Sequence, residues 1–239
     1  MREKVLRDWF KKVVYTNKHW KLLKMKREKA VRILDVLNFH NVKGYIYGSV
    51  ARGDVKPSSD IDIVIFSPPP PYRLEYIIEE AFGRIYSREI VQATPRHALK
   101  AYIYVDPETV VTFPLTPLTN LEYEFYKFGG LLGLEDARNF RNRVPGVDKR
   151  LVLILPNEEG HIERSIIGRE EETARLLGVS LDIIKERIYV LRRRDEIGRT
   201  GTFIRRVLHP DESFDGVLRE LESKNPAVRR LIKSRGLII

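Results

Sequence analysis

The spacing of apolar residues predicts two helices followed by strands. Apolar pairs recur every three to four residues over 1–15 and again over 17–38, as on one face of an amphipathic helix. After a break at 41–44, GYIY (44–47) and DIDIVIF (60–66) have the length and residue types of strands. The chain therefore begins, on this evidence, with N-terminal helices (1–40) that lead into a sheet.

The pattern continues downstream in short segments. The four prolines of SPPPPY (67–72) supply no backbone donors, so we expect an extended spacer there. Helical periodicity over 74–86 precedes a strand, REIVQA (88–93), and a hairpin over 99–115 that turns at 106–109. This order of strands and helices predicts a mixed-sheet domain over 41–118, and an α/β (α+β) fold class.

In the second half of the sequence, proline and glycine interrupt the pattern, and the spacing of apolar residues becomes more typical of helices. We expect helices at 119–128 and 134–142 and a hairpin turning at 157–160, within a connecting region 119–168. From residue 169 onward helix dominates, which predicts a separate, mainly helical unit over 169–239.

Composition narrows the class of protein. The chain has 239 residues, 43% hydrophobic, enough to build a core. It contains no cysteine, which excludes disulfides and thiolate metal sites. It has no apolar run long enough to span a membrane, and its N-terminus lacks the uninterrupted apolar core of a signal peptide. We therefore expect no membrane partner and a cytoplasmic location.

The charge points to a polyanionic partner. The formal net charge is +10, which favours association with nucleotides or nucleic acid. The excess is concentrated late in the chain. The candidate nucleic-acid-binding residues are Lys185, Arg187, Arg192, Arg193, Arg194 and Arg199.

These cations follow a pattern typical of a helix-turn-helix. Ala174, Gly178 and Ser180 provide the small residue, the turn and the N-cap that two crossing helices need. The glycine-rich, then alternating, stretch 196–207 can supply a wing. The segment 169–239 thus resembles winged helix-turn-helix domains, whose arginines would contact phosphates; the alternative is a helical packing module with solvated arginines.

The most informative positions are two aspartates in an otherwise apolar strand. Asp60 and Asp62 project to one face because side chains two apart point the same way, and Ile61 and Ile63 point to the other. Two neighbouring carboxylates repel each other unless a cation lies between them, and Mg²⁺ prefers oxygen ligands. The strand therefore predicts a magnesium site.

A phosphate-binding turn precedes this strand. Gly48 lets the backbone approach a phosphate, and Ser49 adds a hydroxyl donor at the start of a possible helix. Arg52 adds a positive charge in the same segment, either for a phosphate or for the solvent.

Gly48-Ser49, ten further residues and Asp60-Ile61-Asp62 resemble the signature of polymerase-beta-type nucleotidyltransferases. The resemblance covers about 41–92 and implies transfer of a nucleoside monophosphate from a nucleoside triphosphate (NTP) to a hydroxyl, with pyrophosphate as leaving group. It implies two Mg²⁺ ions held by Asp60 and Asp62, with the triphosphate at Gly48 and Ser49.

The family pattern usually has a third metal-binding carboxylate on a later strand. Glu89 in REIVQA is the first candidate; Asp106 or Glu108 at the hairpin turn, or no third ligand, are the alternatives. The function we expect is a metal-dependent nucleotidyltransferase with a hydroxyl acceptor, possibly on nucleic acid. The alternatives are a nucleic-acid-binding regulator with a nucleotide-sensing or inactive domain, and an enzyme that adenylylates a protein or small molecule.

Overall fold

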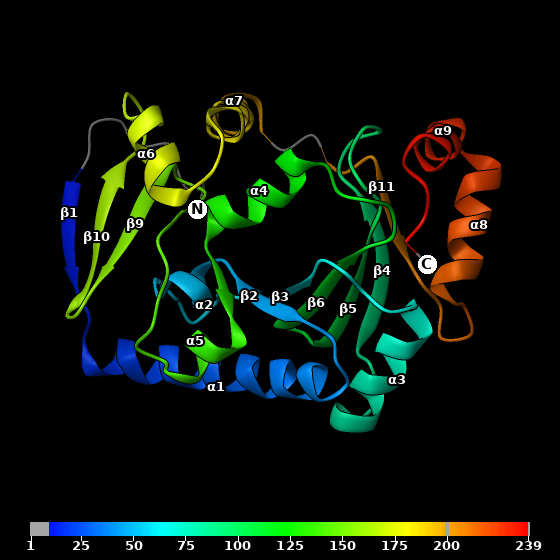
Figure 1. Ribbon diagram of the computed structural model, residues 1–239, viewed down its shortest axis with the longest axis horizontal. Coiled ribbons are helices and arrows are strands. Elements are labelled where there is room, and N and C mark those ends of the chain that lie inside the picture. Colours follow the sequence, from blue (N-terminus) through cyan, green and yellow to red (C-terminus); the bar gives the residue numbers. More distant parts are fainter. Residues whose placement is uncertain (1–9, 199–200, 239) are drawn as a thin grey trace. The chain divides into compact units, whose positions relative to one another are not determined.

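The computed structural model describes residues 10–198 and 201–238 (Figure 1). Within them the chain separates into two compact units, each assembled from three stretches of sequence. Of the described residues, unit 1 comprises 10–31, 46–59 and 120–198, and unit 2 comprises 32–45, 60–119 and 201–238. This division does not follow the four consecutive segments expected from the sequence, because distant segments of the chain pair with each other.

Unit 2 is built on a mixed sheet whose strands lie side by side in the order β11-β4-β5-β6-β3 (Figure 1). The strands are β3 (Ile61–Ile65), β4 (Ser87–Gln92), β5 (Lys100–Asp106), β6 (Thr109–Pro114) and β11 (Ile204–Val207). β3 and β6 are parallel, and the other neighbours are antiparallel. The predicted strands and the predicted hairpin at 106–109 are confirmed.

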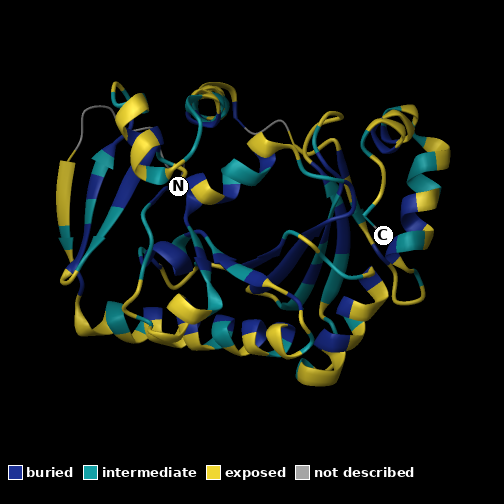
Figure 2. Ribbon diagram, in the orientation of Figure 1, coloured by how far each residue is buried: buried dark blue, intermediate teal, exposed yellow. Residues whose placement is uncertain are grey.

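Helices complete unit 2. They are α3 (Pro71–Phe82), α8 (Phe214–Lys224) and α9 (Pro226–Arg235), together with the end of α1 (Asn17–Phe39). α3 starts at Pro71, at the end of the segment predicted to be extended, because proline is tolerated in the first turn of a helix. All six residues of β6 are buried, which marks it as the centre of the sheet (Figure 2).

Strand β11 corrects the prediction of a C-terminal winged-helix unit. Arg205 and Arg206 pair with Val91 and Ile90 of β4, so the expected wing is an edge strand of the sheet. The two helices before it, α6 (Glu170–Leu177) and α7 (Leu181–Ile197), belong to unit 1. The segment 169–239 is therefore divided between the two units.

Unit 1 contains a second sheet, in the order β1-β10-β9-β8. Its strands are β1 (Phe10–Val14), β8 (Gly146–Val147), β9 (Val152–Asn157) and β10 (Gly160–Ser165). The hairpin predicted at 157–160 is confirmed. The helix predicted over 1–15 is wrong for residues 10–14, which form β1 and pair with β10; its first nine residues lie outside the described part of the chain.

The remaining elements of unit 1 are short, apart from α1, whose predicted existence is confirmed. They are α2 (Ser49–Arg52), α4 (Asn120–Gly129), β7 (Leu131–Gly133) and α5 (Leu134–Arg138). β2 (Gly44–Tyr47) lies where the two units divide. One apolar core of unit 1 joins Phe128, Leu151, Ile166, Ile184 and Leu191. The turn between α6 and α7 has the predicted form: Gly178 is left-handed, with φ 61°, and the Ser180 side chain caps α7.

None of the helices in the described ranges combines the length and the apolar character needed to cross a membrane.

Candidate functional site

The two aspartates are placed as the alternation predicted. Ile61 and Ile63 are each 1% exposed and anchor β3 in the core, whereas Asp60 is exposed and Asp62 is half-buried. The start of the strand is fixed by the hydrogen bond from the Ile61 amide to the Glu108 carbonyl, at 2.7 Å. Because side chains alternate along a strand, Asp62 points to the face opposite Ile61 and Ile63, and Asp60 directly precedes the strand.

On β6, the strand beside β3, the neighbours of Asp62 are apolar or neutral. Asp62 is opposite Val110 on β6, and the next position on that face of β6 is Thr112. Within the described ranges, no group of three or more His, Cys, Asp or Glu side chains is placed to hold a metal ion. Two carboxylates nevertheless fit Mg²⁺, which is commonly bound by one or two carboxylates together with substrate phosphates.

Glu89 does not join this pair, which corrects the first choice for a third metal ligand. β6 and β5 lie between β3 and β4, which separates Glu89 from Asp62 by about 14 Å at roughly 4.8 Å per strand. Its carboxylate is 4% exposed and accepts hydrogen bonds from the Tyr104 hydroxyl at 2.7 Å and from Arg205 Nε at 2.8 Å. Burial and the bond to Glu89 raise the pKa of Tyr104, and the bond to Glu89 raises that of Arg205. Glu89 thus ties β11 to β4 and β5.

The two alternative carboxylates occupy the turn between β5 and β6. Asp106 Oδ1 accepts a hydrogen bond from the Glu108 amide at 3.0 Å, an ordinary turn contact. Glu108 is the candidate whose backbone lies beside the start of β3, through its bond to Ile61. Of the three candidates, the register therefore favours Glu108 as the acid nearest to Asp60.

The Gly48-Ser49 turn lies in unit 1 and has the backbone conformation that its glycine permits. Gly48 has φ 80° and ψ −142°, in a region that disfavours other residues. Its amide donates to the Gly130 carbonyl at 2.9 Å, and its own carbonyl accepts from the amides of Ala51 and Arg52. Ser49 is half-buried, and its hydroxyl has no hydrogen-bond partner among the described residues. The Ser49 hydroxyl is therefore available as a donor.

Arg52 has a structural role in place of the expected phosphate contact. It is 6% exposed; Nε and Nη2 bind the two oxygens of Asp54 at 3.0 and 2.9 Å, and Nη1 donates to the Gly129 carbonyl at 2.6 Å. Burial alone lowers the pKa of Arg52, but the carboxylates of Asp54 and Asp148 outweigh it and raise the pKa. Arg52 fastens the turn to the end of α4 in unit 1.

Sequence reasoning missed Arg27, a second buried cation under the turn. Arg27 is 1% exposed and donates to the carbonyls of Val50 and Asn142, at 2.7 and 2.9 Å. Burial, with a smaller effect of Arg143, lowers its pKa to about 10. Lys26 binds the Ser59 carbonyl at 2.7 Å. The run KMKREK resembles an exposed helix face, so no signal distinguishes these two cations in the sequence.

The sequence analysis also missed the glycines that surround the Gly48-Ser49 turn. The adjacent glycines Gly129 and Gly130 are a signal of close backbone packing that can be read in the sequence. A Cβ on Gly129 would come within 2.4 Å of the Tyr47 ring, and one on Gly130 within 2.7 Å of Arg52 Cγ. A Cβ on Gly146 would meet the Gly129 backbone at 2.7 Å. Three segments of unit 1 therefore approach each other more closely than any side chain would allow.

Comparison with family models gives one match, to the nucleotidyltransferase domain, over residues 27–106. Residues 27–106 form a nucleotidyltransferase domain of the polymerase-beta type. The matched range contains both the Gly48-Ser49 turn and the two aspartates of β3. Neither the comparison with curated proteins nor the comparison with solved structures found a match.

Outside the nucleotidyltransferase domain, the cations of α7 differ from one another. Lys185, Arg193 and Arg194 are exposed, and Arg192 is half-buried. Arg187 lies over the Phe125 ring at 4.9 Å, and burial lowers its pKa, so it belongs to the core of unit 1. Arg199 lies outside the described residues. Of the six candidates, Arg187 is thus the one that packs against an aromatic ring, and the nucleic-acid contacts stay a prediction.

Proposed function

We propose that this protein transfers a nucleoside monophosphate from an NTP to a hydroxyl acceptor, with release of pyrophosphate. The nucleotidyltransferase domain supports the reaction class. The observation that carries the proposal is β3: its isoleucines are buried, and Asp60 and Asp62 extend from the strand as a pair of carboxylates. Mg²⁺ is commonly bound by one or two carboxylates together with substrate phosphates, so this pair suits a metal–nucleotide complex.

Asp60 and Asp62 would hold Mg²⁺; among the described residues no third carboxylate joins them. When bound, the metal neutralises phosphate charge and lowers the pKa of an acceptor hydroxyl. Ser49 and the backbone of the Gly48 turn would bind phosphate oxygens. In the transfer, the acceptor oxygen forms a bond to the α-phosphorus, the bond from that phosphorus to its bridging oxygen breaks, and the hydroxyl proton passes to a carboxylate or to water.

The proposed acceptor is nucleic acid. The net charge of +10 favours a polyanion over a cationic small molecule. Protein and small-molecule acceptors are separate outcomes of the same experiment.

The test is incubation with Mg²⁺, each of the four NTPs labelled at the α-phosphate, and either total RNA, denatured DNA or a protein mixture. The proposal predicts that label from one NTP enters nucleic acid and that pyrophosphate appears in equal amount. A matched set with γ-labelled NTP should leave the acceptor unlabelled. Label transferred from the γ-phosphate, or no pyrophosphate with any acceptor, would contradict the proposal.

A second candidate function is a nucleotide-sensing regulator without transfer activity. It is favoured by one observation: Asp62 faces Val110 on the neighbouring strand, where a carboxylate would complete a metal site. This candidate predicts Mg²⁺-dependent NTP binding without pyrophosphate release, so the same assay combined with a binding measurement separates the two.

A further inference from the structure

A row of alternating cations and aromatic rings runs through unit 1 from the buried Tyr15 to the exposed Arg141 and Lys24. Arg143 lies over the rings of Tyr15 and Trp20, with distances of 5.6 and 4.9 Å to the ring centres. Arg141 lies over Trp20 at 5.0 Å and Phe140 at 5.6 Å, and Lys24 lies over Phe140 at 5.9 Å. We call these six residues the cation–aromatic row.

The two ends of the row differ in what their cations bind. Arg143 is held by the protein: it donates to the carbonyls of Arg141, Asn157 and Gly160. Arg141 is exposed, and its guanidinium makes no hydrogen bond or ion pair with any described residue. Lys24 is also exposed, with Glu28 at 3.7 Å. The exposed end therefore presents the Arg141 guanidinium, which lies against two rings and keeps its hydrogen-bond donors available, and the Lys24 ammonium group beside it.

The charge around the row is strongly positive. Residues 17–31, the start of α1, contain six Lys or Arg and one acid, Glu28. Within this stretch Lys18, Lys21 and Lys24 are exposed and recur every three residues along α1, which places them on neighbouring positions of the helix surface. By comparison, α7 has five basic residues against four acids over 181–197. Of these two elements of unit 1, the start of α1 is therefore the more electropositive.

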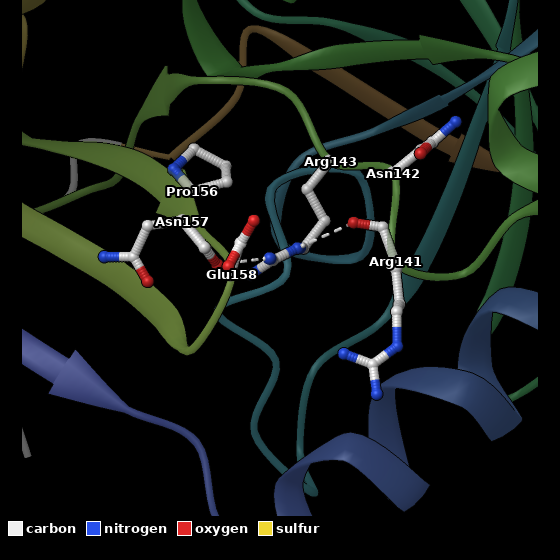
Figure 3. A pocket seen from close by; sticks show the side chains of 6 residues that line it. All are labelled: Arg141, Asn142, Arg143, Pro156, Asn157 and Glu158. Atoms are coloured by element: carbon white, nitrogen blue, oxygen red, sulfur yellow. Dashed lines mark hydrogen bonds between the residues drawn. The ribbon is translucent and has the colours of Figure 1, made fainter.

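A cavity of about 550 Å³ adjoins the row. It is lined by Arg141, Asn142, Arg143, Pro156, Asn157 and Glu158 (Figure 3). In Figure 3 the Arg143 side chain lies between the two segments that line the cavity, 141–143 and 156–158. The Arg141 side chain extends toward α1. The lining combines donors with the Glu158 carboxylate. Such a lining suits the edge of a nucleobase, which has donors and acceptors, better than a bare phosphate, which Glu158 would repel.

We propose that the cation–aromatic row and this cavity bind single-stranded nucleic acid. In this arrangement Arg141, Lys24 and Lys21 contact phosphates, a base stacks on the exposed guanidinium–ring pairs, and a neighbouring base enters the cavity. Stacking needs bases that are free of a complementary strand, so the row selects single strands over a duplex. The assignment of this strand as the acceptor rests on the proposed function, whereas the binding itself does not.

The test is equilibrium binding of fluorescently labelled oligonucleotides, without NTP or Mg²⁺. The probes are oligouridylate and oligodeoxythymidylate of about 12 nucleotides, in the range of single-strand site sizes, and a duplex of equal length. The key comparison is between two double variants that remove equal charge from exposed positions: Lys24→Gln with Arg141→Gln, and Arg193→Gln with Arg194→Gln on α7.

The first double variant should weaken single-strand binding about tenfold, and the α7 variant less than about threefold, since only the first removes placed phosphate contacts. Phe140→Leu should reduce the preference for single strands over duplex. Equal losses in the two double variants, or a larger loss on α7, would overturn the proposal, as would duplex binding as tight as single-strand binding in the wild type. Unchanged thermal unfolding of each variant checks folding.

Asp62→Asn should bind the probes like the wild type. Loss of transfer with retained oligonucleotide binding would leave this inference intact, and failure of oligonucleotide binding with retained transfer would refute this inference alone.

Discussion

Two sets of acids on the sheet of unit 2 show how the surroundings decide the role of a carboxylate. Asp60 and Asp62 extend from β3 at exposed and half-buried positions, next to apolar Val110. Glu89, on the same sheet, is 4% exposed, with Tyr104 and Arg205 bonded to its two oxygens. All three interrupt apolar strands in the sequence. Burial and the two bonded oxygens give Glu89 a structural role, whereas the more accessible carboxylates of β3 are candidate ligands.

The largest expected effect comes from changing the β3 pair. Asp62→Asn, or Asp60→Asn, should lower the rate of pyrophosphate release by about three orders of magnitude, because several kcal/mol of charge stabilisation by the metal is lost. Single-turnover assays with labelled NTP at fixed Mg²⁺ measure this. The thermal unfolding of each variant checks that the loss of rate is not a loss of folding. A variant that retains wild-type rates would remove these aspartates from the chemistry.

Arg52 allows the same comparison between a buried and an exposed cation. Arg52→Met should cost about 3 kcal/mol of stability, because it leaves the largely buried Asp54 without its counter-ion. Urea unfolding measures the change. The matched control, Arg193→Met on α7, removes an exposed arginine and should change stability by less than about 0.5 kcal/mol. Equal costs for the two variants would contradict the structural role of Arg52.

Glu89 should behave in the opposite way to Asp62. Glu89→Gln should lower the unfolding free energy by about 1–2 kcal/mol, since it weakens the bonds to Tyr104 and Arg205. Transfer rates below the unfolding transition should remain within about twofold of wild type, because two strands, β5 and β6, lie between Glu89 and β3. A large loss of rate at unchanged stability would restore Glu89 as a metal ligand.

The smallest effect is a dependence on pH through His19. Burial is the main cause that lowers the pKa of His19 from 6.5, although its bond to the Gly53 carbonyl opposes this. The unfolded state therefore binds more protons near that pH, so stability is present above pH 6.5 and is lost as the pH falls through the folded pKa. Between pH 7 and 5.5, the wild type should lose more unfolding free energy than His19→Asn. Parallel curves would contradict this.

Local patterns predicted β3, α1 and both hairpins because these elements are determined by residues that are close together in the sequence. The alternation around Asp60 and Asp62, and the turn residues at 106–109 and 157–160, are sufficient for these elements. The motif Gly48-Ser49…Asp60-Ile61-Asp62 likewise identified the nucleotidyltransferase domain from contiguous residues.

The predictions that were wrong concern residues whose contact partners lie far away in the sequence. Residues 10–14 have helical spacing, but they pair with residues 160–164 and become a strand. Glu89 is held by Arg205, 116 positions later, and Arg52 by the carbonyl of Gly129. Nothing local distinguishes a cation that will be buried from one that will be solvated, as Lys26 and Arg27 show in α1.

The central claim is that Asp60 and Asp62 together bind the metal that carries the nucleotide. The most direct measurement is NTP affinity with and without Mg²⁺, by titration calorimetry, for the wild type and for the variant carrying both Asp60→Asn and Asp62→Asn. Mg²⁺ should strengthen NTP binding to the wild type and should have no such effect on the double variant. An equal gain from Mg²⁺ in both proteins would contradict it.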